Sequence, residues 1–310
     1  MYRRMLVPLD GSELAEVVFT YAKELAGRLD LEVMLLHVAS PAVREFVPMH
    51  RAYIQRAAEV VRRQARKVQE RTGIQPGGKP VEARGELVVG YPAEEILRYA
   101  DENAVDLILM ATHGRSGLRR WVMGSVADKV LRASKAPVWL IRAGIPEETP
   151  YDQWPITTIL APLDGSELAE SVLPHVEALA KQRGTEPVEV VLLRVCEPLA
   201  MPSYYIPELP DTPLNWGEYM QQETTKCKRM AKEYLAGVEK RLKDIGISVR
   251  SEVLVGKTAD ELVDYANKNP FNLIVMATHG RAGLSRWVYG SVAEYVLLGV
   301  SGPVLLIRPC

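Results

Sequence analysis

Two glycine-punctuated segments of nearly identical sequence contain the residues best suited to binding an anion. ATHGRSGLRRWVMGSV occupies residues 111–126, and ATHGRAGLSRWVYGSV returns at residues 277–292. In the first copy nine residues separate Gly114 from Gly124 and Ser125, and the second copy keeps this spacing. Glycines let backbone N–H groups approach an anion closely, and a helix that begins at the serine adds its dipole. Both segments are therefore candidate phosphate-binding loops.

Charged and hydroxyl side chains within these segments fit the same chemistry. Arginines and a serine hydroxyl can donate hydrogen bonds to phosphate oxygens. The arginines between the glycines are Arg115, Arg119 and Arg120 in the first copy and Arg281 and Arg286 in the second. A tight turn, a capped helix and solvated arginines would explain one copy equally well. The same spacing in a second copy favours phosphate binding, because a turn alone does not require it.

The repeat extends over the whole chain. PLDGSELAE stands at residues 8–16 and again at 162–170, an offset of 154, whereas the glycine segments are offset by 166. The second copy thus has about twelve extra residues, which we place in the proline- and aromatic-rich segment 197–222 and expect to form a long loop. It would cover or fill the second site, or simply lie on the surface. We predict two domains, 1–143 and 158–310, joined by a proline-rich linker at 144–157.

Each half alternates short apolar runs with helical patterns, giving five expected strands and four expected helices. Apolar strands in strict alternation with helices predict a doubly wound α/β domain with a parallel sheet covered on both faces. Ser12 is suited to cap the first helix, and Pro174 should kink or divide the matching helix of the second half. In such a sheet, ligands bind beyond the carboxyl ends of the strands. Asp10 and the first glycine segment both follow strands that end at this edge.

The bulk composition narrows the classes of function. The chain has 310 residues, with 38 basic and 39 acidic side chains, so no overall field attracts nucleic acid or an anionic membrane. Cys196, Cys227 and Cys310 are far apart and have no metal-ligand spacing, which predicts ordinary thiols in a reducing compartment. No apolar stretch suits a membrane span or signal peptide. The expected location is the cytoplasm.

These residues resemble the universal stress proteins in their tandem, two-domain form. The resemblance rests on PLDGSELAE, on the strand end LLHV and on the pattern G-x2-G-x9-G-S/T, and it covers both halves. It implies an adenine nucleotide α-hydrolase-like sheet of strand order 3-2-1-4-5, with ATP at the carboxyl edge. It further implies that the two last strands pair side by side, which makes the chain a covalent pseudo-dimer able to dimerise again.

The resemblance assigns roles to matching positions in the two halves. Asp10 and Asp164 would lie by the ribose and phosphates or by a bound Mg²⁺, although each could equally cap its own turn. Val38 and Val195 would meet adenine through their backbone. The other expected nucleotide-binding residues are Pro8, Met110, Ala111, His113, Gly114, Arg115, Gly124, Ser125 and Val126, with Pro162, Met276, Ala277, His279, Gly280, Arg281, Gly290, Ser291 and Val292 in the second half.

One position departs from the family pattern in both halves. Ala111 and Ala277 stand where the signature has its first glycine. If this position needs a positive φ, alanine costs on the order of 1 kcal/mol and weakens binding several-fold. If the ligand packs directly on the missing side chain, the methyl group blocks it.

Other motifs carry less chemistry. His113 and His279 adjoin the phosphate glycines, where we expect them to orient ligand rather than to catalyse. His37, His50 and His175 have no counterpart in the other half and receive no role. VGKT at 255–258 imitates the end of a P-loop, but Ser251 stands where that motif needs glycine, so we expect Thr258 to cap a helix.

These observations predict a protein that binds ATP or a related adenine nucleotide as a regulatory ligand, without an efficient reaction of its own. Nucleotide would favour one arrangement of a glycine loop and so alter a surface that a protein partner reads. Two alternatives stay open. One is a slow ATPase or phosphotransferase that uses Asp10 with Mg²⁺, and the other is a chaperone or interaction module that binds no nucleotide.

Overall fold

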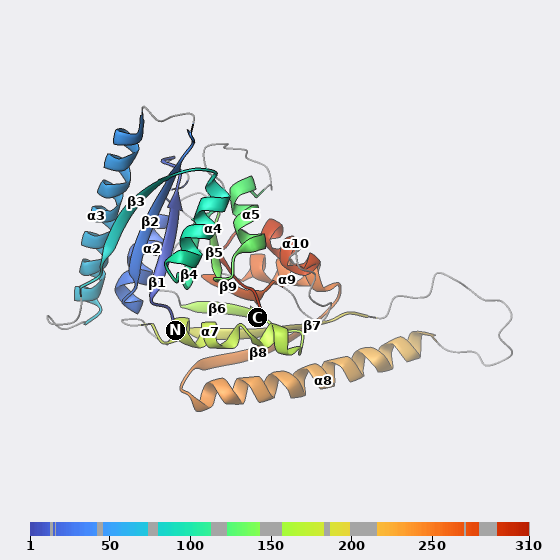
Figure 1. Ribbon diagram of the computed structural model, residues 1–310. Helices are drawn as coiled ribbons and strands as arrows, with labels where there is room; N and C mark the ends of the chain where they lie inside the picture. The colour runs from blue at the N-terminus through green and yellow to red at the C-terminus, as the bar shows by residue number, and fades with distance from the viewer. Residues whose placement is uncertain are drawn as a thin grey trace.

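The chain forms one ten-stranded sheet made of two copies of a five-stranded unit (Figure 1). The computed structural model describes residues 1–12, 15, 17–41, 46–73, 80–112, 123–142, 157–182, 187–198, 216–269, 271–278 and 290–309. The first copy contains β1 (Arg4–Leu9), α2 (Val18–Leu29), β2 (Glu32–Ala39), α3 (Val47–Arg71), β3 (Ala83–Val89), α4 (Pro92–Glu102), β4 (Leu107–Ala111), α5 (Ser125–Ala133) and β5 (Val138–Ile141). The second contains β6 (Thr158–Pro162), α6 (Glu167–Glu170), α7 (Leu173–Ala180), β7 (Glu189–Cys196), α8 (Trp216–Asp244), β8 (Ser248–Val255), α9 (Thr258–Lys268), β9 (Leu273–Ala277), α10 (Ser291–Gly299) and β10 (Val304–Ile307).

The strand order confirms the doubly wound topology. The sheet runs β3-β2-β1-β4-β5-β10-β9-β6-β7-β8, so each copy has the expected order 3-2-1-4-5. All pairs within a copy are parallel, whereas the two copies join through an antiparallel pair in which Trp139 of β5 faces Leu305 of β10. The two last strands therefore pair side by side, as the resemblance implied. Among the described residues, no helix is both long and apolar enough to cross a membrane.

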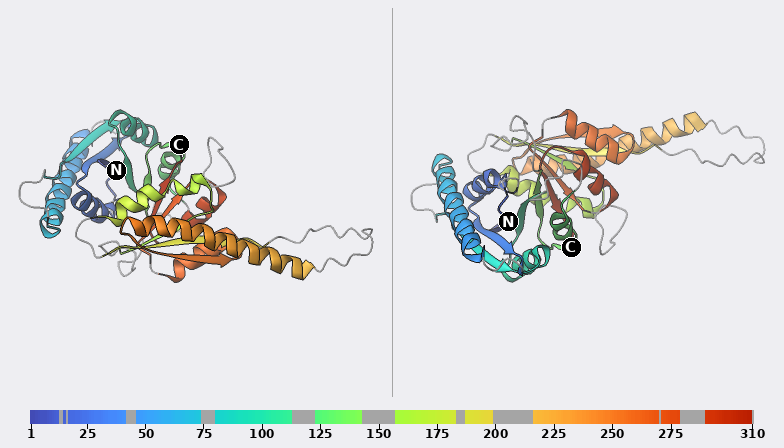
Figure 2. Two further views of the ribbon diagram at one scale, coloured as in Figure 1. Left: turned by 90° about the horizontal axis from the view of Figure 1, so that it is seen from below. Right: turned by 90° about the horizontal axis from the view of Figure 1, so that it is seen from above.

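Helices cover both faces of this sheet because successive strand residues point to opposite sides. In β1, Met5 and Val7 pack in the core that holds α2 and α3, whereas Leu6 packs in the core that holds α4 and α5. The second copy repeats this division, with α7 and α8 on one face and α9 and α10 on the other. Figure 2 shows α3 and α8 along the outer sides of their halves. Helices on both faces leave the strand ends at the sheet's edge to form a site.

Two arginines join the halves by reciprocal hydrogen bonds. Arg142, just after β5, donates to the carbonyl oxygens of Val300 (2.8 Å) and Leu298 (3.0 Å) at the end of α10. Arg308, just after β10, donates to the carbonyl oxygen of Arg132 (3.2 Å) in the last turn of α5. The last carbonyls of a helix lack partners within it and carry partial negative charge, which a cation stabilises. The last helix of each half is thus held at its carboxyl end by the other half.

A second contact between the halves predicts a pH dependence. The Tyr2 hydroxyl lies 2.6 Å from Nδ1 of His175 in α7, and burial lowers the pKa of His175 to about 4 from 6.5. Above pH 6.5 the histidine is neutral in both the folded and the unfolded chain. Between about pH 6.5 and 4 the unfolded chain is protonated while the folded chain is not. The free energy of unfolding should therefore decrease as the pH is lowered from 6.5 to 4. Urea titrations at several pH values check this, and His175→Gln should show a shallower fall; equal slopes would contradict it.

The second half departs locally from a uniform pattern. Its first helix is divided into α6 and α7, and Pro174 lies at the start of α7, which confirms the expected break. In the expected loop 197–222, residues 199–215 lie outside the described residues, but 216–222 belong to α8. The loop prediction is wrong for these residues, because the run after Pro213 contains no further proline and can extend the helix. Of the expected linker, 144–157, only Thr157 is described.

Close packing of α3 against β3 depends on Gly85. A Cβ atom at Gly85 would overlap with the carbonyl oxygen of Ile54 in α3. We expect Gly85→Ala to lower the free energy of unfolding by about 1–3 kcal/mol, because the helix backbone must shift. Gly237→Ala is the control, since Gly237 lies within α8 with nothing within 4 Å of the added atom, and it should stabilise by about 0.5–1 kcal/mol. Chemical denaturation measures both, and an unchanged Gly85→Ala would refute the close approach.

Candidate functional site

The carboxyl ends of β1, β2 and β4 and the start of α5 enclose a cavity of about 410 Å³ in the first half. This is the edge where open parallel sheets bind ligands. All eight predicted first-half residues that are described line this first cavity: Pro8, Asp10, Val38, Met110, Ala111, Gly124, Ser125 and Val126. The predicted residues that the structure describes thus meet around one cavity.

Asp10 and Asp164 each organise the turn that follows the first strand of their half. Oδ1 of Asp10 accepts hydrogen bonds from the backbone N–H (3.0 Å) and the hydroxyl (2.6 Å) of Ser12, and Asp164 binds Ser166 in the same way at 2.9 and 2.6 Å. The glycine between the aspartate and the serine, Gly11 or Gly165, has a φ of 79° or 83°, which glycine adopts readily. Ser12 Oγ accepts in turn from the N–H of Ala15, at 3.2 Å. The described helix α2 has Val17 as its N-cap, without a side-chain bond, so Ser12 does not cap that helix. Both aspartates thus cap a turn beside the cavity.

The two alanines at the signature position have ordinary backbone geometry. Ala111 of β4 pairs with Ile141 of β5, and Ala277 of β9 pairs with Ile307 of β10. Neither alanine is among the described non-glycine residues with positive φ. The expected cost of a left-handed alanine therefore does not arise. Both alanines line their cavities, so the remaining question is whether the added methyl group takes space from a ligand.

Hydrogen bonds bring the two ends of each candidate phosphate loop together. The N–H of Thr112 donates to Ile141 (2.8 Å), and the N–H of Gly124 donates to the carbonyl oxygen of Thr112 (2.8 Å). Thr278 and Gly290 repeat this bond at 2.6 Å. The end of the fourth strand is thereby fixed beside the start of the last helix. Each threonine stands inside the repeated ATHG, within the stretches 110–114 and 276–280 that the resemblance assigned to ribose and phosphates.

The last helix of each half begins at the cavity. α5 starts at Ser125 and α10 at Ser291, each preceded by glycine as the N-cap residue, and neither N-cap makes a side-chain bond to its helix. The first N–H groups of a helix have no acceptor within it, and the dipole gives them partial positive charge. A phosphate group is the type of ligand that this arrangement favours.

Two histidines of the first cavity were missed from the sequence. The buried His37 places Nδ1 2.9 Å from the carbonyl oxygen of Leu9, and its ring stacks on His50 with centroids 4.5 Å apart at 19°. Tyr53 meets the His37 ring edge-on at 6.2 Å. Both histidines line the cavity next to Val38. The only sequence signal was the position of His37 beside Val38, and nothing marked His50.

The second half has a corresponding cavity of about 550 Å³ with different walls. All eight described predicted residues of this half line it: Pro162, Asp164, Val195, Met276, Ala277, Gly290, Ser291 and Val292. Arg194 takes the place of His37 and lies over the Tyr234 ring, 5.2 Å from its centroid. Glu197 Oε1 accepts a 2.7 Å hydrogen bond from the N–H of Thr258. Thr258 is the first residue of α9 and Lys257 its N-cap, so the predicted capping role of Thr258 is wrong.

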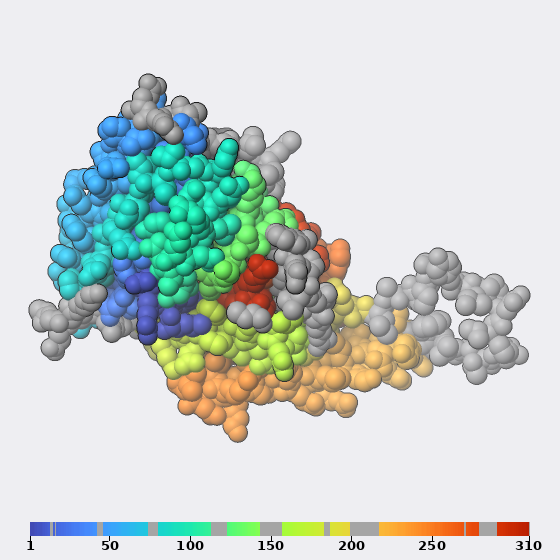
Figure 3. Space-filling model, in the orientation of Figure 1, coloured from blue at the N-terminus to red at the C-terminus, as the bar shows by residue number. Residues whose placement is uncertain are grey.

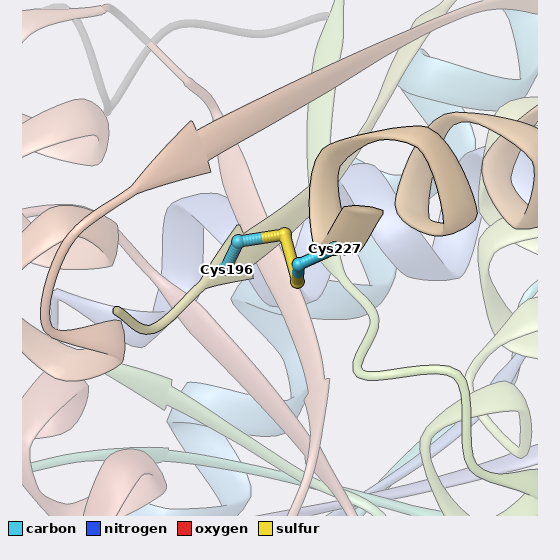
Figure 4. The surroundings of a disulfide bond; sticks show 2 residues. All are labelled: Cys196 and Cys227. Carbon is cyan, nitrogen blue, oxygen red and sulfur yellow. A yellow bond between two sulfur atoms is a disulfide. The ribbon is translucent and has the colours of Figure 1, made fainter. Parts of the chain in front are cut away.

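Cys196 and Cys227 form a disulfide at the wall of the second cavity (Figure 4). It joins the end of β7 to α8 across 31 residues of sequence, with the Cα atoms 6.0 Å apart. The prediction of ordinary thiols is wrong for this pair. Spacing along the chain could not reveal it, because a strand end and a helix turn meet only through the fold.

Several predicted residues lie outside the described part of the chain. They are His113, Gly114, Arg115, Arg119 and Arg120 in the first half and His279, Gly280, Arg281 and Arg286 in the second. Within the described ranges, no group of three or more histidine, cysteine, aspartate or glutamate side chains could hold a metal ion.

Comparison with known proteins identifies the family that this fold and repeat define. The family model "Universal stress protein family" matches residues 1–142 and 155–308, so the chain belongs to this family in its tandem form. Universal stress protein Rv2005c of Mycobacterium tuberculosis (strain H37Rv) is 24% identical over 310 residues, covering 98% of this chain and 96% of that protein.

Two further relatives illustrate the single-domain and tandem arrangements. Universal stress protein YxiE of Bacillus subtilis is 33% identical over 150 residues, which cover 46% of this chain and 100% of that protein. The crystal structure of a universal stress protein from Archaeoglobus fulgidus superposes with a TM-score of 0.62 at 19% identity, covering 98% of both chains. The latter supports the fold of the whole tandem unit.

Proposed function

We propose that this universal stress protein binds ATP, or a related adenine nucleotide, as a regulatory ligand. The observation that supports this most is the meeting of three strand ends and the start of α5 around one cavity. Its volume of about 410 Å³ is within the range of small-molecule sites. Apolar side chains suit a base at one end, and helical N–H groups suit phosphates at the other.

The residues of the first cavity fit the parts of such a ligand. The base would lie against Val38 and His50, and the phosphates would lie at the N–H groups of Ser125 and Val126. Asp10 would meet the ribose or a Mg²⁺ ion that enters with the phosphates. That ion would supply positive charge to the phosphate oxygens. In the second half, Val195, Ser291 and Asp164 offer the same arrangement.

We infer a regulatory role rather than efficient catalysis. Oδ1 of Asp10 already accepts two hydrogen bonds from Ser12, so its first task is to hold the turn. Ligand at the start of α5 would favour one arrangement of the loop before it, and a protein partner would read the altered surface. The slow ATPase is the competing proposal. Phosphate release that disappears in Asp10→Asn and Asp164→Asn would support it.

The setting of this activity is also a proposal. We infer that the protein acts in the cytoplasm, where ATP is available to it, and that the pseudo-dimer can pair with a second copy. We place the two domains at residues 1–143 and 158–310, with 144–157 as their linker. Limited proteolysis followed by mass spectrometry would test these boundaries, because cleavage should concentrate in the linker.

Calorimetric titration with ATP and Mg²⁺ tests the proposed function. Saturation at about a hundred times the dissociation constant should stabilise the fold by roughly 2.7 kcal/mol, which a melting curve detects. Mass spectrometry of ligand released from freshly purified protein is the companion measurement. Absence of heat and of released nucleotide would instead favour an interaction module that binds no nucleotide.

His50 provides a sharper test of where the base binds. We expect His50→Ala to weaken ATP binding about tenfold, because one flat ring beside the base contributes about 1–1.5 kcal/mol. The ring is held by stacking on His37, 4.5 Å between centroids, so His50→Phe should retain most of the affinity. Calorimetry of both variants measures the difference. Equal affinity for His50→Ala and the parent protein would place the base elsewhere.

A further inference from the structure

We propose that Cys196 and Cys227 form a site of thiol–disulfide exchange with low-molecular-weight thiols, and that its redox state controls the second cavity. The exchange chemistry stands on the disulfide itself. The effect on ligand rests on the proposed function.

The two sulfur atoms differ in access. Cys196 ends β7 and is only 1% exposed, whereas Cys227 is partly buried and lines the second cavity. An attacking thiolate must reach one sulfur of the pair directly. It can reach the Cys227 sulfur through the cavity, so a mixed disulfide should form at Cys227 and not at Cys196.

The disulfide is the first point at which α8 is fastened to the sheet. The buried side chains of α8 are Ala231, Leu235, Val238 and Leu242, which recur at helical spacing, and Cys227 stands four residues before the first of them. No side chain at residues 217–226 is buried. Figure 1 shows this end of α8 extending beyond the sheet, and Figure 3 shows it projecting from the body of the molecule. Without the covalent bond, residues 217–226 have no buried side chain that holds them to the sheet.

The strand end at Cys196 connects this helix to the cavity. Its neighbours Val195 and Glu197 both line the second cavity, and Glu197 also holds the first N–H of α9. The first half has the same backbone arrangement without the covalent bond. The carbonyl oxygen of Ala39 accepts from Gly90 at 3.0 Å, as that of Cys196 accepts from Gly256 at 3.1 Å. Redox control is therefore specific to the second half.

The exchange proceeds in two steps. A thiolate RS⁻ attacks the Cys227 sulfur, the bond between Cys227 and Cys196 breaks, and Cys196 leaves as a thiolate that takes a proton from water. A second RS⁻ attacks the small-molecule sulfur of the mixed disulfide, forming RSSR and releasing the Cys227 thiolate. Two RSH are thus oxidised to RSSR while the protein disulfide gains two electrons and two protons. Oxidation by a small disulfide such as oxidised glutathione is the reverse.

The oxidised state should bind ligand more tightly in the second cavity. The disulfide holds the wall that Cys227 contributes, and a preformed wall avoids the cost of ordering it on binding. Reduction frees the start of α8 from the sheet, so that this part of the cavity wall encloses the ligand less completely. We expect a dissociation constant about tenfold higher after reduction.

The experiment uses the full chain carrying Ser125→Glu, which disables the first cavity, and Cys310→Ser, which removes the remaining thiol. Oxidised and dithiothreitol-reduced protein are compared by thiol titration after denaturation, by hydrogen exchange at residues 217–227 and by ATP calorimetry. We expect no free thiols in the oxidised protein and two in the reduced protein. Hydrogen exchange at residues 217–227 should be at least tenfold faster after reduction, and the dissociation constant for ATP should be about tenfold higher. Brief treatment with reduced glutathione should trap the adduct on Cys227. Cys227→Ser in the same background should not respond to oxidant.

Each result has a definite meaning. Two free thiols after exposure to oxidised glutathione, or an adduct on Cys196, would overturn the exchange site. Equal ATP affinity in both redox states, with binding present, would overturn control of the cavity. Hydrogen exchange at 217–227 that depends on redox state, without ATP binding in either state, would support the site of thiol–disulfide exchange. It would refute the proposed nucleotide function of this cavity.

Discussion

Replacement of Ser125 by glutamate should weaken ATP binding by about a hundredfold or more while leaving the fold intact. Ser125 is exposed at the first position of α5 and lines the first cavity. A carboxylate there would face the phosphates at a separation well below the Debye length, so salt screens it only in part. Like charges brought together at a binding surface cost several kcal/mol, and about 3 kcal/mol corresponds to a hundredfold.

The same substitution should not harm folding, which separates binding from stability. Glutamate in the first turn of a helix interacts favourably with the dipole, by about 0.3–1 kcal/mol. Ser291→Glu at the start of α10 is the matched control. It should remove binding from the second cavity only, so calorimetry of the two variants assigns each site. Unchanged affinity in both variants, with both folded, would show that the phosphates do not lie at these helices.

Loss of the Cys196–Cys227 disulfide should produce the largest change in stability. The bond closes a loop across 31 residues of sequence. In the chain-entropy account a loop of this length contributes about 3–4 kcal/mol by restricting the unfolded chain. Oxidised Cys227→Ser should therefore unfold with about that much less free energy than the oxidised parent.

Reducing conditions provide the control for this measurement. In dithiothreitol the parent protein should lose most of its advantage over Cys227→Ser, because both then lack the bond. Guanidinium denaturation with and without reductant measures the four values. A parent protein that is equally stable in both conditions would contradict a stabilising disulfide.

The repeat made the fold predictable from sequence. The alternation of elements and the resemblance predicted the order 3-2-1-4-5 and the pairing of β5 with β10, which the sheet confirms. It also placed Asp10, Val38 and Gly124 at one edge, because the carboxyl ends of parallel strands meet there. These features depend on local patterns and on topology, and both can be read from a chain that repeats itself.

The features that were missed depend on contacts between distant segments. Thr258 looked like a helix cap, but the partner of its N–H is Glu197, 61 residues earlier, at the end of β7. His50 lies in α3 and reaches the cavity only because that helix packs beside the end of β2. Because the second half has no matching histidine, comparison of the repeats excluded it. The disulfide was missed because Cys196 and Cys227 are 31 residues apart and meet only through the fold.

A crystal structure of the protein grown with excess ATP and Mg²⁺ tests the central claim most directly. We predict adenine between Val38 and His50, and the phosphates against the N–H groups at the start of α5. A nucleotide bound at another surface, or a first cavity closed by its own side chains at saturating ATP, would contradict the account.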